Sequence, residues 1–291
     1  RGFGPAPQGE DPAWPRSSSR GSSLPRAMAT GRTQLLSEHL VERLLMDAAG
    51  DKAIGVVAVD QANGNRRSVM ADLVVLCAST IQTLAILLRS QEQGLKEPSG
   101  RLGTRLMDHV STSQFFCMPQ SGAGAQPALT GAGSFLLPFG RRLDGADFSG
   151  GYGLWGGIGR FDPPIWLRRR PQSVTGFLIG HGEVIPQACN RVTLNGAVDR
   201  WGVAVPHIDC QWSRNELAMV AHMRQQMKRC IHAAGGEALP LKDLFHLPLV
   251  EPLLQGAVAL SDAASPPGYY IHEVGGAAMG KECSDSVVDP D

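Results

Sequence analysis

The segment ADLVVLCASTIQTLAILLRS, residues 71–90, constrains the fold more than any other part of the chain. Residues 73–78 are apolar at successive positions, which is typical of a strand that is covered on both faces. A tight turn follows, and then apolar residues recur at helical spacing. This spacing is carried by Ile81, Leu84, Ala85, Leu87 and Leu88. The segment therefore predicts a strand, a turn and a helix, the unit from which nucleotide-binding sheets are built.

Two interpretations of the turn at Ser79 and Thr80 stay open. Both residues would offer hydroxyl and backbone N–H groups at a helix N-terminus, where such folds bind a nucleotide. Small residues at this point can also do no more than permit a tight turn. No G-x-G-x-x-G fingerprint occurs in the chain, so the local sequence favours the second interpretation.

The remaining elements are predicted from periodicity and turn residues. Residues 53–60 and 68–78 are β-branched runs separated by an Asn-Gly signal, which predicts a hairpin. Across residues 111–210, short strand-like pieces divided by Gly, Pro and Asp predict an antiparallel sheet. The segment from 237 to 270 is apolar but broken by prolines, and we expect short helices or a loop over a cavity. Residues 1–32 show neither the helical nor the strand periodicity, so we expect a loose arm, pinned by Trp14.

A long helix is predicted between Ser213 and Gly235. Ser213 and Glu216 have the spacing of a capping box, and Gly235 is a typical C-terminal stop. We expect one side of this helix to face the core. That side consists of Leu217, Val220, Met223, Met227, Cys230 and Ile231.

The composition argues against several classes of function. Twenty-seven basic residues balance 27 acidic residues, so no net charge favours nucleic acid or an anionic membrane. No run approaches the roughly 20 apolar residues of a transmembrane helix, and we expect a soluble protein. The six cysteines form no C-x-x-C pair; we expect them to be reduced and mostly buried, Cys77 among them, which favours the cytoplasm. Because the chain starts at Arg1 and stops after SVVDPD, we also expect a fragment.

Two common catalytic patterns are incomplete. His272 and Glu273 imitate the first half of the zinc-protease motif H-E-x-x-H, but the second histidine is missing, so we expect no metal site. No G-x-S-x-G elbow is present, so a hydrolase triad has no place for its nucleophile. On local sequence alone, His272 would be an ordinary buried imidazole.

Four segments occur in the order and approximate spacing of one protein family. They are residues 71–90, GRLGTRLMDHV (100–110), NRVTL (190–194), and HEVGGAAMG continuing to SVVDPD (272–291). The chain resembles the later part of a glucose-methanol-choline (GMC) flavoprotein oxidoreductase over residues 33–291. Its H-E-x-G-x-x-x-M-G and L-M-D-H forms are most similar to the sugar- and polyol-oxidising branches.

The resemblance implies a mixed α+β and α/β fold, in which part of an FAD-binding domain joins a substrate domain. We expect an antiparallel sheet flanked by helices, as in GMC and p-hydroxybenzoate hydroxylase-like enzymes. The implied parts are an arm at 1–32, part of the FAD-binding domain at 33–110 and a substrate domain at 111–268. Residues 269–291 would carry the active-site segment back to the FAD domain.

The resemblance also implies a reaction and its residues. The family uses FAD to oxidise an alcohol CH–OH group by hydride transfer, while a neutral histidine removes the hydroxyl proton. Imidazole suits this role, since its ordinary pKa lies near neutral pH. His272 matches the catalytic histidine by position and neighbours.

Four further residues match cofactor positions. Val41 matches a strand position whose backbone reaches the adenine, and Ala78 and Ser79 match the turn near the adenosine diphosphate part. Gly275 would let the backbone approach the flavin ring, because glycine lacks a Cβ atom. We expect His109 to be structural. Glu273 fits either the active site or a surface ion pair.

Departures from the family pattern motivate an alternative. The dinucleotide fingerprint is absent, and so is the stretch that would follow residue 291, so we expect the chain not to hold FAD alone. Ala278 stands where an arginine is usual, and Ser79 where a glycine is usual. These changes suit a degenerate, non-catalytic binding or structural module, and an unrelated α+β domain is a third interpretation. The sequence does not identify the alcohol or sugar substrate or the electron acceptor.

Overall fold

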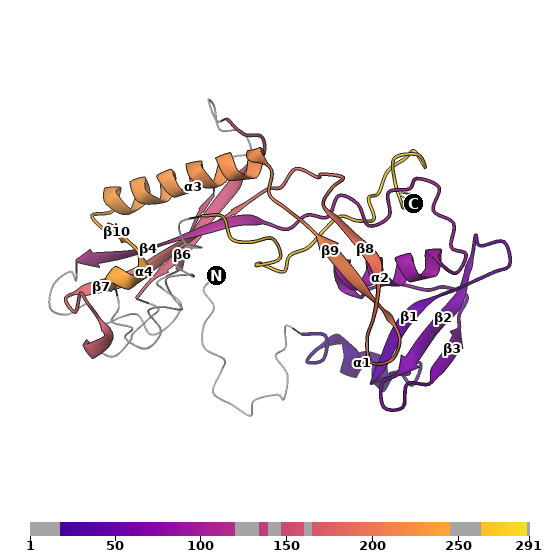
Figure 1. Ribbon diagram of the computed structural model, residues 1–291. Coiled ribbons are helices and arrows are strands. Elements are labelled where there is room, and N and C mark those ends of the chain that lie inside the picture. Colours follow the sequence, from indigo (N-terminus) through magenta and orange to yellow (C-terminus); the bar gives the residue numbers. More distant parts are fainter. Residues whose placement is uncertain (1–17, 120–133, 139–146, 160–164, 245–262, 290–291) are drawn as a thin grey trace.

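The computed structural model describes residues 18–119, 134–138, 147–159, 165–244 and 263–289, and these form two lobes (Figure 1). The helical elements are α1 (Ser23–Ala29), α2 (Ser79–Gln91), η1 (Ile165–Leu167), α3 (Arg214–Ala233) and α4 (Leu241–Leu244). The strands are β1 (His39–Met46), β2 (Ala53–Asp60), β3 (Arg66–Met70), β4 (Val110–Pro119), β5 (Ser134–Pro138), β6 (Tyr152–Ile158), β7 (Ser173–Gly182), β8 (Arg191–Val198), β9 (Ala204–Asp209) and β10 (Glu237–Leu239).

One lobe is built around α2. On one side of this helix lies the antiparallel sheet β1-β2-β3, joined to it where the Ser90 hydroxyl accepts the Leu44 N–H (2.8 Å). On the other side lies the β8-β9 hairpin, whose Val192 packs against Leu84 of α2. The hairpin predicted around the Asn-Gly signal is confirmed as β2 and β3, with Gly64 in the left-handed region at φ +76°.

The strand predicted at residues 73–78 is not formed. The chain leaves β3 at Met70 and reaches α2 without pairing to any described strand. Leu73 is 79% exposed and Val75 is 71% exposed. The expectation that the cysteines are mostly buried was wrong, because Cys77, Cys189 and Cys283 are exposed and Cys117 alone of the six is buried. An apolar run forms a covered strand only when other strands and helices supply its partners, and the described residues supply none here.

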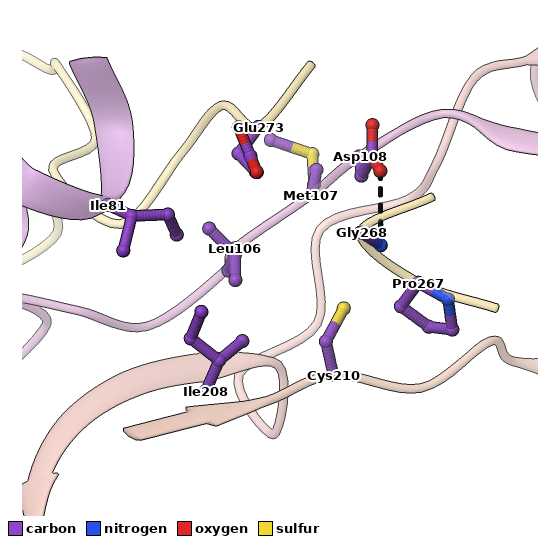
Figure 2. Close-up of a pocket in the computed structure, with 9 residues that line it drawn as sticks. All are labelled: Ile81, Leu106, Met107, Asp108, Ile208, Cys210, Pro267, Gly268 and Glu273. Atoms are coloured by element: carbon purple, nitrogen blue, oxygen red, sulfur yellow. Dashed lines mark hydrogen bonds between the residues drawn. The ribbon is translucent and has the colours of Figure 1, made fainter. Parts of the chain in front are cut away.

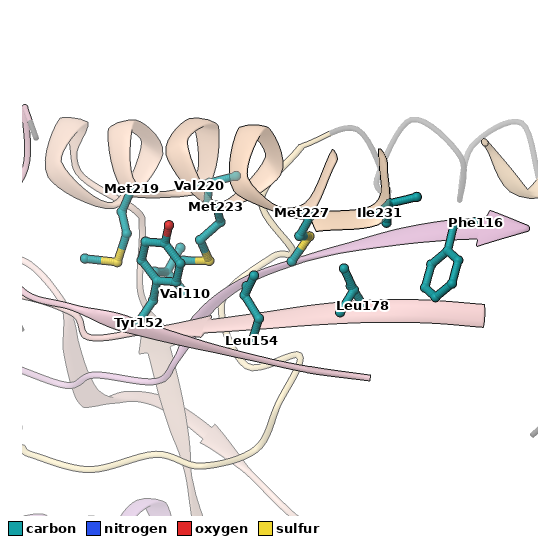
Figure 3. Close-up of a cluster of buried hydrophobic side chains, with 10 residues drawn as sticks. All are labelled: Val110, Phe116, Tyr152, Leu154, Leu178, Met219, Val220, Met223, Met227 and Ile231. Carbon is teal, nitrogen blue, oxygen red and sulfur yellow. The ribbon is translucent and has the colours of Figure 1, made fainter. Parts of the chain in front are cut away.

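The other lobe is a five-stranded antiparallel sheet of order β10-β4-β7-β6-β5, with α3 across one face. The antiparallel sheet expected within residues 111–210 is thus confirmed, except that β8 and β9 form a separate hairpin on α2. Figure 3 shows the core between α3 and the sheet, where three methionines of the helix lie over apolar side chains of the strands. These methionines are Met219, Met223 and Met227.

The helix α3 begins as the sequence predicts. The Ser213 side chain accepts the Asn215 N–H (3.1 Å), and the Glu216 carboxylate accepts the Ser213 N–H (2.8 Å), which completes a capping box. Gly235 follows the helix at φ +80°, as a C-terminal stop should. The predicted core face was wrong in one position, because Leu217 is exposed and Met219 is fully buried in its place.

The structure describes only parts of the N-terminal arm and of the proline-broken segment at residues 237–270. Residues 23–29 form α1, so the interpretation of 1–32 as an arm without regular structure was wrong in this part. Trp14 lies outside the described residues. Most of the proline-broken segment, residues 245–262, lies outside them too, although its start forms β10 and the short helix α4.

Candidate active site

The candidate site lies between the lobes, where two segments of the chain run alongside each other. Residues 265–276 run along residues 103–111, and this pairing is held by backbone hydrogen bonds at several points. Met107 and Val274 exchange N–H···O bonds of 2.9 and 3.0 Å, and the Ser265 N–H donates to the Ser111 carbonyl (2.8 Å). This pairing carries His272 to a position beside the start of β4.

Three histidines from three distant segments meet there. The ring of His109 lies 5.3 Å from that of His272 in an edge-on arrangement, and 5.3 Å from that of His181, on which it stacks. His272 is exposed, so the interpretation of a buried core imidazole does not hold. His109, which the sequence analysis expected to be structural, is exposed as well and contacts the ring of His272. Within the described ranges, no group of three His, Cys, Asp or Glu residues is placed to hold a metal ion.

A buried carboxylate fixes the backbone around these histidines. Asp108 Oδ1 accepts the N–H groups of His109 (2.7 Å) and His272 (3.2 Å), while its Oδ2 accepts the Gly268 N–H (3.1 Å), the bond dashed in Figure 2. Hydrogen bonds to a charged acceptor are about twice as strong as neutral ones. Asp108 therefore ties the two crossing segments together at the point where His272 projects.

The backbone is strained around the site. Of the four non-glycine residues with positive φ among those described, three lie here: Ser79 (φ +59°), Arg105 (φ +63°) and Ile271 (φ +51°). A β-branched residue is rarely found in this region, so Ile271 is held there by its surroundings, directly before His272. Such strained residues cluster at functional sites.

Burial changes the acid–base properties of the surrounding groups. It lowers the pKa of His181 to about 4, and the nearby His109 and His272 add to this effect, whereas Asp108 opposes it. Burial also raises the pKa of the Tyr270 phenol to about 12. The Tyr270 ring lies 4.1 Å from the His181 ring. Both side chains are therefore neutral at neutral pH.

A pocket of about 310 Å³ is lined by residues that flank His272 in the chain, among them Gly268 and Glu273 (Figure 2). Asp108 and Glu273 are its acidic residues, and the rest of the wall is mainly apolar. The apolar and small lining residues are Ile81, Leu106, Met107, Ile208, Cys210, Pro267 and Gly268. Glu273, for which the sequence left two interpretations, thus lies at the site.

A second, more open pocket of about 380 Å³ lies at the start of α2. It is lined by Ser79 and Gly275, two of the predicted cofactor residues, and by Thr80, whose hydroxyl donates to the Glu273 carbonyl (2.5 Å). Among the described residues, no side chain caps this end of α2. An uncapped helix start beside a pocket is an arrangement that can bind an anion through its first N–H groups.

The other predicted cofactor residues are placed differently. Ala78 precedes Ser79 as the N-cap residue of α2. Val41 lies on β1, which meets the far end of α2 through the Arg89 side chain and the Glu42 carbonyl (2.7 Å), and it does not line the pocket. The conformation of Gly275 (φ +88°) has a reason within the chain, since a Cβ atom there would lie 2.2 Å from the Arg105 carbonyl oxygen.

Two residues of this site, Asp108 and His181, are not predicted from the sequence. Asp108 belongs to the L-M-D-H segment. Its role follows from its burial beside the exposed His109, and a sequence pattern does not show burial. His181 lies on β7, where successive side chains point to opposite faces of the sheet. His181 points to the face opposite α3, but the sequence does not reveal that His109 meets it there.

Comparison with known proteins agrees with this arrangement. The N-terminal model of the GMC oxidoreductases matches residues 2–111, and the C-terminal model matches residues 186–291. The chain belongs to the GMC oxidoreductase family. The match begins at residue 2, so it also includes the arm, for which the sequence analysis found no place in the family.

Two solved structures are similar to this chain, and the first of them supports the α+β fold. The structure of formate oxidase is similar over 87% of this chain and 52% of that chain, with 16% identity and a TM-score of 0.53. The structure of pyridoxine 4-oxidase from Mesorbium loti is similar over 87% of this chain and 49% of that chain, with 18% identity and a TM-score of 0.48. This GMC chain thus spans about half the length of these proteins. No curated protein sequence matches it.

GMC oxidoreductases are, as a family, FAD-dependent oxidoreductases. Among the residues that the structure describes, no helix has both the length and the apolarity to cross a bilayer.

Proposed function

We propose that this chain carries the alcohol-binding and proton-accepting part of an FAD-dependent oxidoreductase that acts on a CH–OH group. His272 is the proposed general base. The observation that carries this proposal is the exposed His272 ring, held beside His109 and anchored through Asp108. Bound FAD would supply the hydride acceptor for the alcohol carbon.

The residues of the chain have separate tasks in this proposal. His272 accepts the hydroxyl proton as the carbonyl group of the product forms. His181 remains neutral, because burial lowers its pKa to about 4, and so it places no second positive charge near His272 when that ring takes the proton. Asp108 holds the His272 backbone in position.

Ser79, Ala78 and Gly275 are the residues that we propose to hold the cofactor. Ala78 and Ser79 suit its diphosphate part, since the uncapped end of α2 offers N–H donors and the positive end of the helix dipole. Gly275, which lines the same pocket as Ser79, keeps its assignment to the flavin ring. We assign Val41 to the adenine end on the family resemblance alone. The sugar or polyol preference suggested by the sequence motifs stays a prediction.

Replacing His272 tests the proposal. In flavin-loaded protein containing this chain, His272→Ala should slow flavin bleaching by an alcohol about 10²- to 10⁴-fold, the usual contribution of a general base. His39→Ala, on β1, is the control and should leave the rate unchanged. An equal rate for His272→Ala and the unaltered protein would favour the alternative, a non-catalytic module, which Ala278 and Ser79 motivate.

A further inference from the structure

The five-stranded sheet has two faces of different character. On β7, even-numbered residues such as Leu178 are buried under α3, while the odd-numbered residues 177, 179 and 181 point to the opposite face and are half-buried. On β6, Trp155 points to this second face and is 37% exposed. The register pairs Ile179 with Trp155, which fixes both side chains on one face.

Aromatic rings form a continuous row from this face to His272. Trp155 lies 5.6 Å from Phe177 and 6.2 Å from His181. The row then continues through the His181–His109 and His109–His272 contacts, each 5.3 Å between ring centroids. The second face of the sheet is therefore a wall of the same site as the proposed base, although it comes from the other lobe.

On the described positions of β4 to β7 that point to this wall, no carboxylate, ammonium or guanidinium group is present. Hydroxyl groups do occur on it, at Ser111, Ser113, Ser173 and Thr175. The neighbours of Trp155, however, are the apolar side chains of Leu136, Phe177 and Ile179. The hydroxyls of a polyol that left water beside Trp155 would find no side-chain partner among these residues.

Two polar atoms of the wall, Ser111 Oγ and His181 Nε2, are buried and have no hydrogen-bond partner among the described residues. Because the protein covers both atoms, they offer no accessible group to the hydroxyls of a ligand. The part of the wall that a ligand can reach is the surface around Trp155, which is 37% exposed and suits a flat apolar group.

We propose that Trp155, Phe177 and His181 select an alcohol whose hydroxyl-bearing carbon is attached to a flat, apolar group, such as an aryl-methanol, over a sugar or polyol. This inference rests on the proposed function, since it assigns the substrate class of the same site. The reaction is unchanged: the alcohol carbon loses a hydride, and the oxygen loses its proton to His272.

Ligand binding by the 291-residue chain tests the inference without the flavin. Benzyl alcohol and sorbitol are added in turn, and binding is followed by saturation-transfer NMR and by the change in tryptophan fluorescence. Benzyl alcohol should bind with a Kd at least about tenfold below that of sorbitol. Trp155→Ala should raise the Kd of benzyl alcohol about tenfold, which is close to the largest contribution that one aromatic contact makes. Trp155→Phe should leave this Kd unchanged.

Trp166→Ala is the matched control, since Trp166 lies on η1, outside the row, and is 71% exposed. This variant should bind benzyl alcohol as the unaltered chain does. Equal or tighter binding of sorbitol, absence of benzyl alcohol binding, or an unchanged Kd in Trp155→Ala would each overturn the inference.

The two proposals fail separately. In flavin-loaded protein, benzyl alcohol should bleach the flavin with a kcat/KM at least about tenfold above that for sorbitol, and Trp155→Ala should act through KM. Faster bleaching by sorbitol would overturn the substrate class and leave His272 as the base. If no alcohol bleaches the flavin, the proposed function is wrong, and the binding experiment still decides whether the wall selects aryl alcohols.

Discussion

His181 is the residue whose chemistry its surroundings change most. Its ring stacks on His109, touches Tyr270 and faces Asp108 and His272, and burial lowers its pKa to about 4 from 6.5. A histidine with a lowered pKa binds fewer protons in the folded than in the unfolded state between these two values. The free energy of unfolding should therefore fall as the pH drops from about 6.5 to about 4.

Replacing this histidine should flatten that pH dependence. For His181→Phe, the loss of stability between pH 6.5 and pH 4 should be smaller than in the unaltered chain by about 1–2 kcal/mol. This figure is smaller than the free-energy change that the full pKa shift of His181 would give, because part of the ring faces water, which screens its interactions. Urea unfolding at several pH values measures the effect, and His207→Phe, on the exposed strand β9, is the control. Parallel pH profiles for the unaltered chain and His181→Phe would contradict the prediction.

At the scale of single residues, the sequence predicted His272 and Ser79 as site residues but not which distant residues would lie beside them. Ser79 lines a pocket together with Gly275, 196 positions away by residue number, and His272 meets His109 and His181. Such meetings depend on how distant segments pack, and no local pattern encodes them. Asp108 was missed for the same reason, since its three N–H partners come from two segments.

At the scale of elements, the returning segment 265–276 depends on close backbone approach. A Cβ atom at Gly275 would lie 2.2 Å from the Arg105 carbonyl oxygen, and the residue has φ +88°. Alanine there must therefore push the two crossing segments apart. Gly268 has a similar φ of +81°, but nothing lies within 4 Å of its Cβ position.

Alanine substitutions at Gly268 and Gly275 distinguish the cost of a left-handed backbone conformation from the cost of a steric clash. Gly268→Ala should cost about 1–2 kcal/mol through its left-handed backbone alone, and Gly275→Ala should cost more. Gly275→Ala should also speed hydrogen exchange of the Met107 amide, which donates to the Val274 carbonyl (2.9 Å). Equal costs, with unchanged exchange at Met107, would show that the collision is relieved by a local shift.

Elements with strong local signals formed where the sequence predicted them. The capping box at Ser213 and the stop at Gly235 bound α3, and the Asn-Gly signal marks the β2–β3 turn. The strand expected at residues 73–78 failed, because an apolar run specifies burial but cannot supply the strands that would pair with it. The exposure of Leu217 was a smaller error of the same kind, since α3 turns Met219 toward the sheet instead.

At the scale of the whole molecule, the exposed run at residues 73–78 is the most unusual surface. Val75 is 71% exposed, whereas Val57 on β2 is 5% exposed. The same substitution at both positions therefore compares a surface valine with a core valine. Val75→Thr should change the free energy of unfolding by less than about 0.5 kcal/mol, while Val57→Thr should lower it by about 1–3 kcal/mol.

Urea unfolding of the 291-residue chain measures both costs, and binding of the dye ANS should fall in Val75→Thr because less apolar surface is offered. A cost for Val75→Thr as large as that for Val57→Thr would mean that this run is covered in solution, for example by a second copy of the chain.

The amino-acid pattern was sufficient for the family, the helices α2 and α3 and the β2–β3 hairpin, and it singled out His272 as the histidine that we propose as the base. These features arise from interactions between residues close in the chain, such as capping bonds, turn conformations and helical periodicity. The tertiary structure alone decided that His109, His181 and His272 meet, that Asp108 anchors them and that residues 73–78 stay uncovered. Each of these depends on contacts between segments far apart in sequence, whose free energy arises only when the lobes and their crossing segments have packed.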